Sequence, residues 1–212
     1  DINQPLNDIT YFRQAQTATV ALNFYNNGIN FFKSELDILG KGSERYLTLE
    51  FPLYEAGVAV LYKIFFVSDF FGKIVSVSAG FLGACFLFLI IRKFGATEKV
   101  ALLSVFFFML APLNMFHQKD FLIEPTVIFL LLTGLYFYLR FIINSDPLSL
   151  ILAPFFFTLG VIHKPMYGPF WLLPVYYFYH RHKRKIMPDF NFFLIMVLPI
   201  LFNLLELQVS SA

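Results

Sequence analysis

The stretch Leu49-Glu50-Phe51-Pro52-Leu53-Tyr54 marks the border between two very different parts of this 212-residue sequence. The residues before it are polar enough to lie in water, and most residues after it are too apolar to do so. Because proline suits the first position of a helix, Pro52 predicts a helix over residues 52–67. Glu50 therefore stands at the edge of a membrane, where a carboxylate without a partner is costly.

The composition is typical of a membrane protein. Hydrophobic residues make up 58% of the chain and charged residues only 14%, whereas soluble domains carry about 25% charged residues. Thirty phenylalanines exceed what a water-soluble core of this size can bury, so lipid must cover part of them. The apolar runs are continuous and do not alternate, which predicts an all-α, polytopic membrane protein rather than a membrane β-barrel. The net charge of +2 does not indicate nucleic-acid binding.

Hydropathy divides the chain into two parts. Residues 1–73 are expected to form a loop on the outer face with two interfacial helices, 8–27 and 52–67, since both are too polar or too short to span. Residues 74–212 are expected to form a transmembrane bundle of about six spans. The chain is expected to be a fragment of a longer protein. The expected spans are 74–91, 100–116, 125–143, 149–162, 167–179 and 190–207.

Positive charge predicts the orientation of these spans. Basic clusters at 92–99 and 180–185 belong in the cytoplasm by the positive-inside rule. Counting crossings from these clusters places residues 1–73, the loop 117–124 and the turn 163–165 together on the opposite face. This arrangement requires that the second interfacial helix does not cross the membrane.

Polar residues gather on that outer face. Asp8 and Glu124 are candidate catalytic carboxylates, since a carboxylate can take the proton of an acceptor hydroxyl. Each also has a simpler interpretation, Asp8 as a helix cap and Glu124 as a charge that suits a helix N-terminus. Lys164 is either a phosphate ligand or a lysine that extends to the interface. The candidate substrate-binding residues are Arg13, Glu50, Lys164, Lys119 and Asp120.

Other kinds of site have little support in the sequence. The four histidines do not form a metal-ligand spacing backed by carboxylates, so no metal site is predicted. The cofactor is unknown, and the sequence leaves open whether a divalent metal takes part. A glycine-rich loop that could hold a nucleotide phosphate is not evident. The lone Cys85 lies in an apolar run and implies no disulfide framework.

The order and spacing of several segments resemble a known family. They are similar to the N-terminal half of bacterial GT-C membrane glycosyltransferases, the family 39-like enzymes related to dolichyl-phosphate-mannose-protein mannosyltransferases. Lipid A aminoarabinose transferases are distant relatives of these enzymes. The resemblance covers most of residues 5–180. The segments that carry it are Asp8, Arg13-Gln14-Ala15-Gln16-Thr17-Ala18, Asn23-Phe24-Tyr25, Glu50-Phe51-Pro52-Leu53-Tyr54, Lys119-Asp120-Phe121-Leu122-Ile123-Glu124-Pro125 and Lys164-Pro165.

The resemblance implies a function as well as a fold. It implies transfer of a sugar from a polyprenyl-phosphate donor to a lipid, glycan or protein acceptor, with inversion at the anomeric carbon. Asp8 would be the base that activates the acceptor, Glu124 a second acid, and Lys164 and Arg13 the cations around the phosphate leaving group. The enzyme would lie among the lipids of a bacterial inner membrane, with its active site facing the periplasm or exterior.

Two other functions are compatible with the same residues. A transporter or flippase for a lipid-linked glycan would use the outer charges for binding alone, although the inverted repeats typical of transporters are not evident. A non-catalytic membrane subunit would depend on its lipid-facing phenylalanines and would tolerate neutral residues in place of the outer charges.

Overall fold

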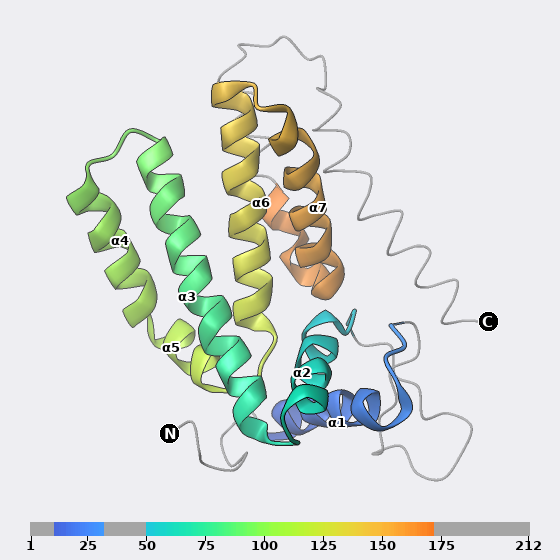
Figure 1. Ribbon diagram of the computed structural model, residues 1–212. Helices are drawn as coiled ribbons and strands as arrows, with labels where there is room; N and C mark the ends of the chain where they lie inside the picture. The colour runs from blue at the N-terminus through green and yellow to red at the C-terminus, as the bar shows by residue number, and fades with distance from the viewer. Residues whose placement is uncertain (1–10, 32–49, 172–212) are drawn as a thin grey trace.

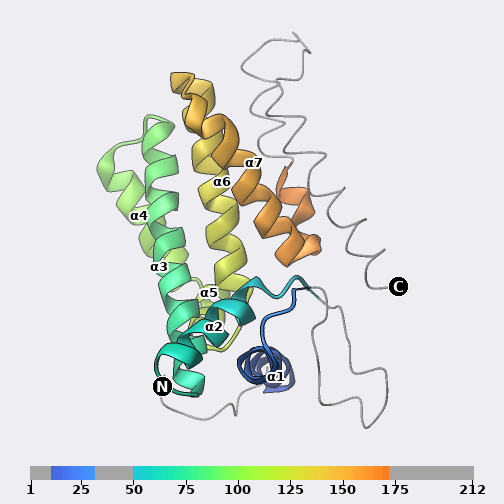
Figure 2. The same cartoon turned by 45° about the vertical axis from the view of Figure 1, so that its right-hand side comes forward.

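The computed structural model describes residues 11–31 and 50–171, and these residues form helices and connecting segments without a strand. Helices α3, α4, α6 and α7 lie side by side in a bundle, while α1 and α2 lie at one end of it (Figures 1 and 2). The predicted all-α membrane fold is therefore confirmed. The end occupied by α1 and α2 is where four of the candidate site residues meet.

Helix α1 spans Tyr11–Asn27 and matches the described part of the helix predicted at 8–27. Its buried face includes Val20, Ala21 and Phe24, which follow the three- and four-residue spacing of an amphipathic helix. The helix ends at Gly28, whose φ of 94° is a conformation that glycine adopts without a Cβ penalty. The amide of Gly28 donates to the carbonyl of Phe24 over 3.1 Å, which closes the last turn.

Helix α2 spans Leu53–Ile64, directly after Pro52 as predicted, and it ends three residues before the predicted boundary. The reason is local, because the side chain of Ser68 accepts a hydrogen bond from the amide of Phe70 and caps the next helix. The chain must therefore turn between Ile64 and Ser68. With 12 residues, α2 rises about 18 Å, which is shorter than the roughly 30 Å hydrocarbon core of a bilayer.

Helices α3, Asp69–Lys93, and α6, Glu124–Asn144, are both long and apolar enough to cross a membrane. They correspond to the spans predicted at 74–91 and 125–143. The two helices pack together through a cluster that includes Ile90, Leu132 and Leu139. This pair forms the centre of the bundle, with α4 packed on α3 and α7 packed on α6 (Figure 1).

The span predicted at 100–116 is broken into two helices. Helix α4 spans Glu98–Leu110, helix α5 spans Pro112–Lys119, and the chain bends by 63° between them. Pro112 explains the break, because it lacks an amide hydrogen and disfavours helical geometry at Ala111 before it. If the bent pair counts as one span, the described residues hold three candidate spans.

Helix α7 spans Pro147–His163 and packs on α6, matching the apolar run predicted at 149–162. It is followed by η2, a 3₁₀ helix over Pro165–Trp171, where the sequence predicts the beginning of a span at 167–179. Pro165 and Pro169 both lack the amide hydrogen that an α-helix interior needs. The rest of that run and all of 190–207 lie outside the described residues. The total of about six spans and the division at residue 73 stay predictions.

Candidate functional site

Four charged residues from separate segments meet where α1 and α2 cover the end of the bundle. Arg13 lies in the first turn of α1, Glu50 lies just before α2, Glu124 begins α6, and Lys164 follows the last residue of α7. Figure 2 shows these segments close together below α6 and α7. We refer to these four residues as the ion-pair cluster.

The charges in the ion-pair cluster alternate in sign. Nη2 of Arg13 lies 2.6 Å from Oε1 of Glu50, and its Nε lies 3.8 Å from Oε1 of Glu124. Nζ of Lys164 donates to Oε1 of Glu124 and lies 3.9 Å from Oε1 of Glu50. Each cation therefore faces both acids, and the cluster is neutral as a whole when all four residues are charged.

The two ion pairs differ in their exposure to solvent. The side chains of Glu124 and Lys164 are each 7% exposed, whereas those of Arg13 and Glu50 are 44% and 22% exposed. Burial raises the pKa of Glu50 above its ordinary value, and the opposing effects of Arg13 and Lys164 are smaller. The Lys164–Glu124 pair is therefore the buried part of the cluster, its floor, and the Arg13–Glu50 pair is the part that solvent reaches.

His163 links the floor of the cluster to the segment that carries Glu50. The residue is fully buried, and its Nδ1 donates to the carbonyl of Phe51 over 2.5 Å. Sequence reasoning did not select His163 as a site residue, although its position directly before Lys164 at a predicted membrane boundary was a usable signal. The bond fixes the end of α7 relative to the start of α2.

A second set of contacts positions the residues that precede Glu124. The hydroxyl of Tyr54 donates to the carbonyl of Gly72 over 2.6 Å and lies 2.9 Å from Oγ of Ser76. Ser76 in turn donates to the carbonyl of Leu122 over 2.9 Å. Tyr54 is fully buried in the cluster that also contains the ring of Phe121. Helices α2 and α3 therefore jointly hold the loop that leads into Glu124.

A third glutamate lies close to the ion-pair cluster but forms none of its ion pairs. Glu55, in the first turn of α2, is 7% exposed, and its Oε2 has no hydrogen-bond partner among the described residues. Burial raises the pKa of Glu55 to about 8. A carboxylate in the first turn of a largely apolar helix was the signal that sequence reasoning did not use.

The remaining predicted site residues are not part of the ion-pair cluster. Lys119 is exposed, with its ammonium 5.1 Å from the centre of the Phe116 ring, and Asp120 is buried directly after the end of α5. Asp8, the predicted base, lies outside the described residues. Within residues 11–31 and 50–171, no group of three or more His, Cys, Asp or Glu residues could hold a metal ion.

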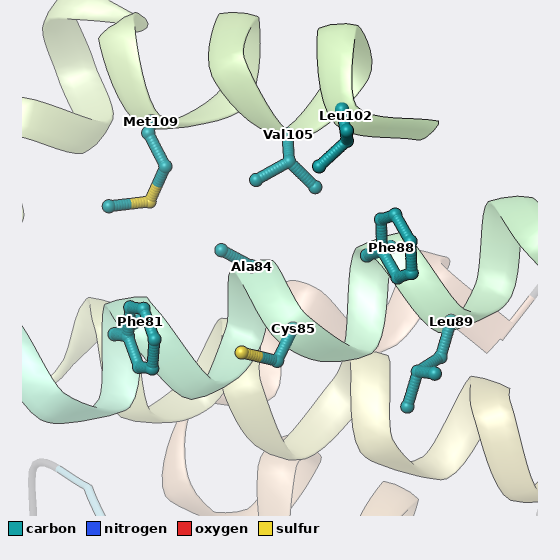
Figure 3. A pocket seen from close by; sticks show the side chains of 8 residues that line it. All are labelled: Phe81, Ala84, Cys85, Phe88, Leu89, Leu102, Val105 and Met109. Atoms are coloured by element: carbon teal, nitrogen blue, oxygen red, sulfur yellow. The ribbon is translucent and has the colours of Figure 1, made fainter. Parts of the chain in front are cut away.

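A separate apolar cavity of about 470 Å³ lies between α3 and α4, as Figure 3 shows. Phe81, Cys85 and Phe88 line it from α3, and Leu102 and Met109 line it from α4. Its lining shares no residue with the ion-pair cluster. The wall of this cavity contains no charged side chain, so it offers no cation to a phosphate group.

The fold resembles one solved glycosyltransferase structure. No family model matches the chain, and no curated protein matches it in sequence. The crystal structure of ArnT from Cupriavidus metallidurans bound to undecaprenyl phosphate is similar, with a TM-score of 0.72 and 14% sequence identity. The match covers 98% of this chain and 38% of ArnT, so the chain spans little more than a third of that protein's length. The likeness shows that the chain has a GT-C-like fold, as its sequence resemblance implied.

Proposed function

We propose that this chain belongs to a membrane glycosyltransferase that moves a sugar from a polyprenyl-phosphate donor to an acceptor. The observation that carries the proposal is the meeting of two cations and two acids at one end of an apolar helical bundle with the fold of ArnT. ArnT is bound to undecaprenyl phosphate in its crystal structure, which supports the same class of lipid as the donor carrier here.

The chemistry of the transfer suits the residues of the cluster. The acceptor oxygen attacks the anomeric carbon as the bond from that carbon to the phosphate oxygen breaks, and the phosphate leaves with the bonding electron pair. Lys164 and Arg13 would stabilise the charge on this leaving group, because preorganised cations act where charge develops. The proton of the acceptor would pass to a carboxylate, for which Asp8 and Glu124 are the candidates. Attack from the face opposite the phosphate inverts the anomeric carbon.

The ion pairs present before the donor binds would affect when Glu124 can act as a base. Lys164 donates to Glu124 and Arg13 to Glu50, so a phosphate that binds these cations must compete with both glutamates. A carboxylate that loses its cation becomes a stronger base. Donor binding would therefore free Glu124 to accept a proton at the moment when the acceptor needs one.

The charge distribution supports a site on the non-cytoplasmic face. Arg92 and Lys93 lie in the last turn of α3, whereas the ion-pair cluster lies near the opposite end of the bundle (Figure 1). If the basic end faces the cytoplasm, the cluster faces the periplasm or exterior. A bacterial inner membrane is the location that fits this proposal, with a lipid, glycan or protein as the acceptor.

Two measurements on the purified protein test the proposal. We expect Lys164→Gln and Arg13→Gln to weaken binding of a polyprenyl monophosphate by at least about tenfold each, because each removes one cation contact to the phosphate. Arg140→Gln, which removes an Arg140–Asp146 pair at the other end of α6, should leave binding unchanged. Equal binding in all three variants would refute the phosphate site.

A transfer assay then separates an enzyme from a transporter. We expect Glu124→Gln and Asp8→Asn to abolish release of the sugar from a polyprenyl-phosphate-sugar donor while the variants still insert in the membrane. Full sugar transfer by both variants would show that neither carboxylate takes the acceptor's proton. Binding of the donor without any sugar transfer in the unaltered protein would favour the transporter.

A further inference from the structure

Glu55 occupies the centre of the buried face of α2. The buried positions of this helix are Tyr54, Glu55, Ala56, Val58, Ala59 and Tyr62. At 100° per residue these positions form one continuous stripe, and Glu55 falls in its middle. Ala56 and Ala59, at one edge of the stripe, pack against Val20 and Phe24 of α1, the helix that carries Arg13. The other edge packs against residues of α1, of α3 and of the segment before α6.

No cation neutralises Glu55 among the described residues. Its side chain forms none of the ion pairs in this part of the chain, and its Oε2 accepts no hydrogen bond there. The charges of Glu50, Arg13 and Glu124 nevertheless act on it, which places Glu55 near three members of the ion-pair cluster. Helical side chains lean toward the helix N-terminus, and for Glu55 that is the direction of Glu50.

Other elements that pack on α2 also carry charges, and α3 reaches the residue next to Glu55, because the hydroxyl of Tyr54 donates to the carbonyl of Gly72. Helix α3 carries Asp69 and Lys73 in its first two turns, and Asp69 acts on Tyr62, two turns away from Glu55. An isolated carboxylate in an apolar contact is costly, and protonation removes the cost. The pKa of about 8 that burial gives Glu55 agrees with a neutral side chain at pH 7.

We propose that Glu55 regulates anion binding at the ion-pair cluster. The cluster binds an anionic headgroup tightly while Glu55 is protonated and more weakly when Glu55 is ionised. This inference rests on the proposed function, since it assigns a regulator to the same phosphate site. It adds a residue that the sequence resemblance does not include.

The charges around Arg13 determine how tightly an anion binds. With Glu55 neutral, the cluster holds two positive and two negative charges, and a phosphate binds by taking Arg13 and Lys164 from Glu50 and Glu124. An ionised Glu55 would add a third carboxylate beside Arg13. It would compete with the phosphate for the guanidinium and repel the phosphate directly. One added charge within roughly 10 Å, at the effective dielectric of a partly buried site, weakens anion binding by about tenfold.

The test measures the dissociation constant of a polyprenyl monophosphate for the purified protein between pH 7 and pH 9. The second pKa of a phosphate monoester lies near 6, so the probe itself changes little over this range. We expect the unaltered protein to lose about tenfold in affinity as Glu55 ionises, whereas Glu55→Gln should vary by less than about twofold. Glu98→Gln, an exposed residue in the first turn of α4, is the matched control and should keep the full pH dependence.

The outcomes separate this inference from the proposed function. Binding with the same pH dependence in the unaltered protein and in Glu55→Gln would overturn the role of Glu55 and leave the phosphate site standing. Absence of binding in the unaltered protein at every pH would overturn both. If Glu55→Gln does not fold, Glu55→Asp decides the question, because a shorter carboxyl in the same place should shift the midpoint of the pH dependence. An unchanged midpoint in Glu55→Asp would count against the proposal.

Discussion

His163 and Phe51 are joined by a hydrogen bond of 2.5 Å between Nδ1 and the backbone carbonyl oxygen, although they lie 112 positions apart in the sequence. Each residue is the direct neighbour of a member of the ion-pair cluster, Lys164 in one case and Glu50 in the other. The bond therefore fixes the distance between an acid and a cation that belong to different parts of the chain.

We expect His163→Leu to lower the free energy of unfolding by about 1–2 kcal/mol, because the Phe51 carbonyl loses its donor at a buried contact. The variant should also bind a polyprenyl monophosphate more weakly, since Glu50 is no longer held beside Lys164. Thermal unfolding in detergent and a binding titration measure the two effects. His117→Leu, in α5 and away from the cluster, is the control and should change neither quantity.

The Lys164–Glu124 pair should be sensitive to the loss of one partner. Both side chains are 7% exposed, and removing one member of a buried pair costs about 3–5 kcal/mol, because the other charge stays buried without compensation. We expect Lys164→Met to show this cost in thermal unfolding, and Lys164→Met combined with Glu124→Leu to recover most of it.

The Arg140–Asp146 pair provides the comparison for that experiment. Its side chains are 40% and 22% exposed, so Arg140→Met should cost less than about 1 kcal/mol. If Lys164→Met is no more destabilising than Arg140→Met, the floor of the cluster is not a buried ion pair in the protein.

Four of the seven charged residues selected from the sequence meet in the ion-pair cluster, but the sequence did not show how each one is held. Glu50, Glu124 and Lys164 were recognised because a charge beside a long apolar run is costly, and this cost can be read from one segment at a time. Proline likewise predicted the start of α2. Whether Asp8 joins these residues stays a prediction.

What the sequence did not reveal depends on contacts between segments. The burial of Glu55 follows from the packing of α2 in the fold, and His163 gains its role from a carbonyl in a distant segment. The bend at Pro112 was missed because hydropathy is continuous across it, whereas the missing amide hydrogen is a local backbone property. Lys119 and Asp120 precede Glu124 by a few residues, and their part in the site stays a prediction.

Glu55 also makes the stability of the protein depend on pH. Its pKa is raised on folding, from about 4.5 to about 8, so the stability present below pH 4.5 is lost as the pH rises toward 8. Between pH 5 and pH 8, we expect the free energy of unfolding of the unaltered protein to fall by about 1 kcal/mol per pH unit more than that of Glu55→Gln. Urea or thermal unfolding at several pH values measures the difference, with Glu98→Gln as the control. If the free energy of unfolding has the same pH dependence in the unaltered protein and in Glu55→Gln, Glu55 is not buried as described.

Two glycines offer a matched test of how α2 and α3 hold the loop before Glu124. A Cβ at Gly72 would overlap the ring of Phe121, which is fully buried, so we expect Gly72→Ala to destabilise the protein by about 1–3 kcal/mol. Nothing lies within 4 Å of a Cβ at Gly57, which is exposed in the interior of α2, so Gly57→Ala should stabilise it by about 0.5–1 kcal/mol. Thermal unfolding of both variants measures the two effects, and a stabilising Gly72→Ala would show that Phe121 does not pack against α3.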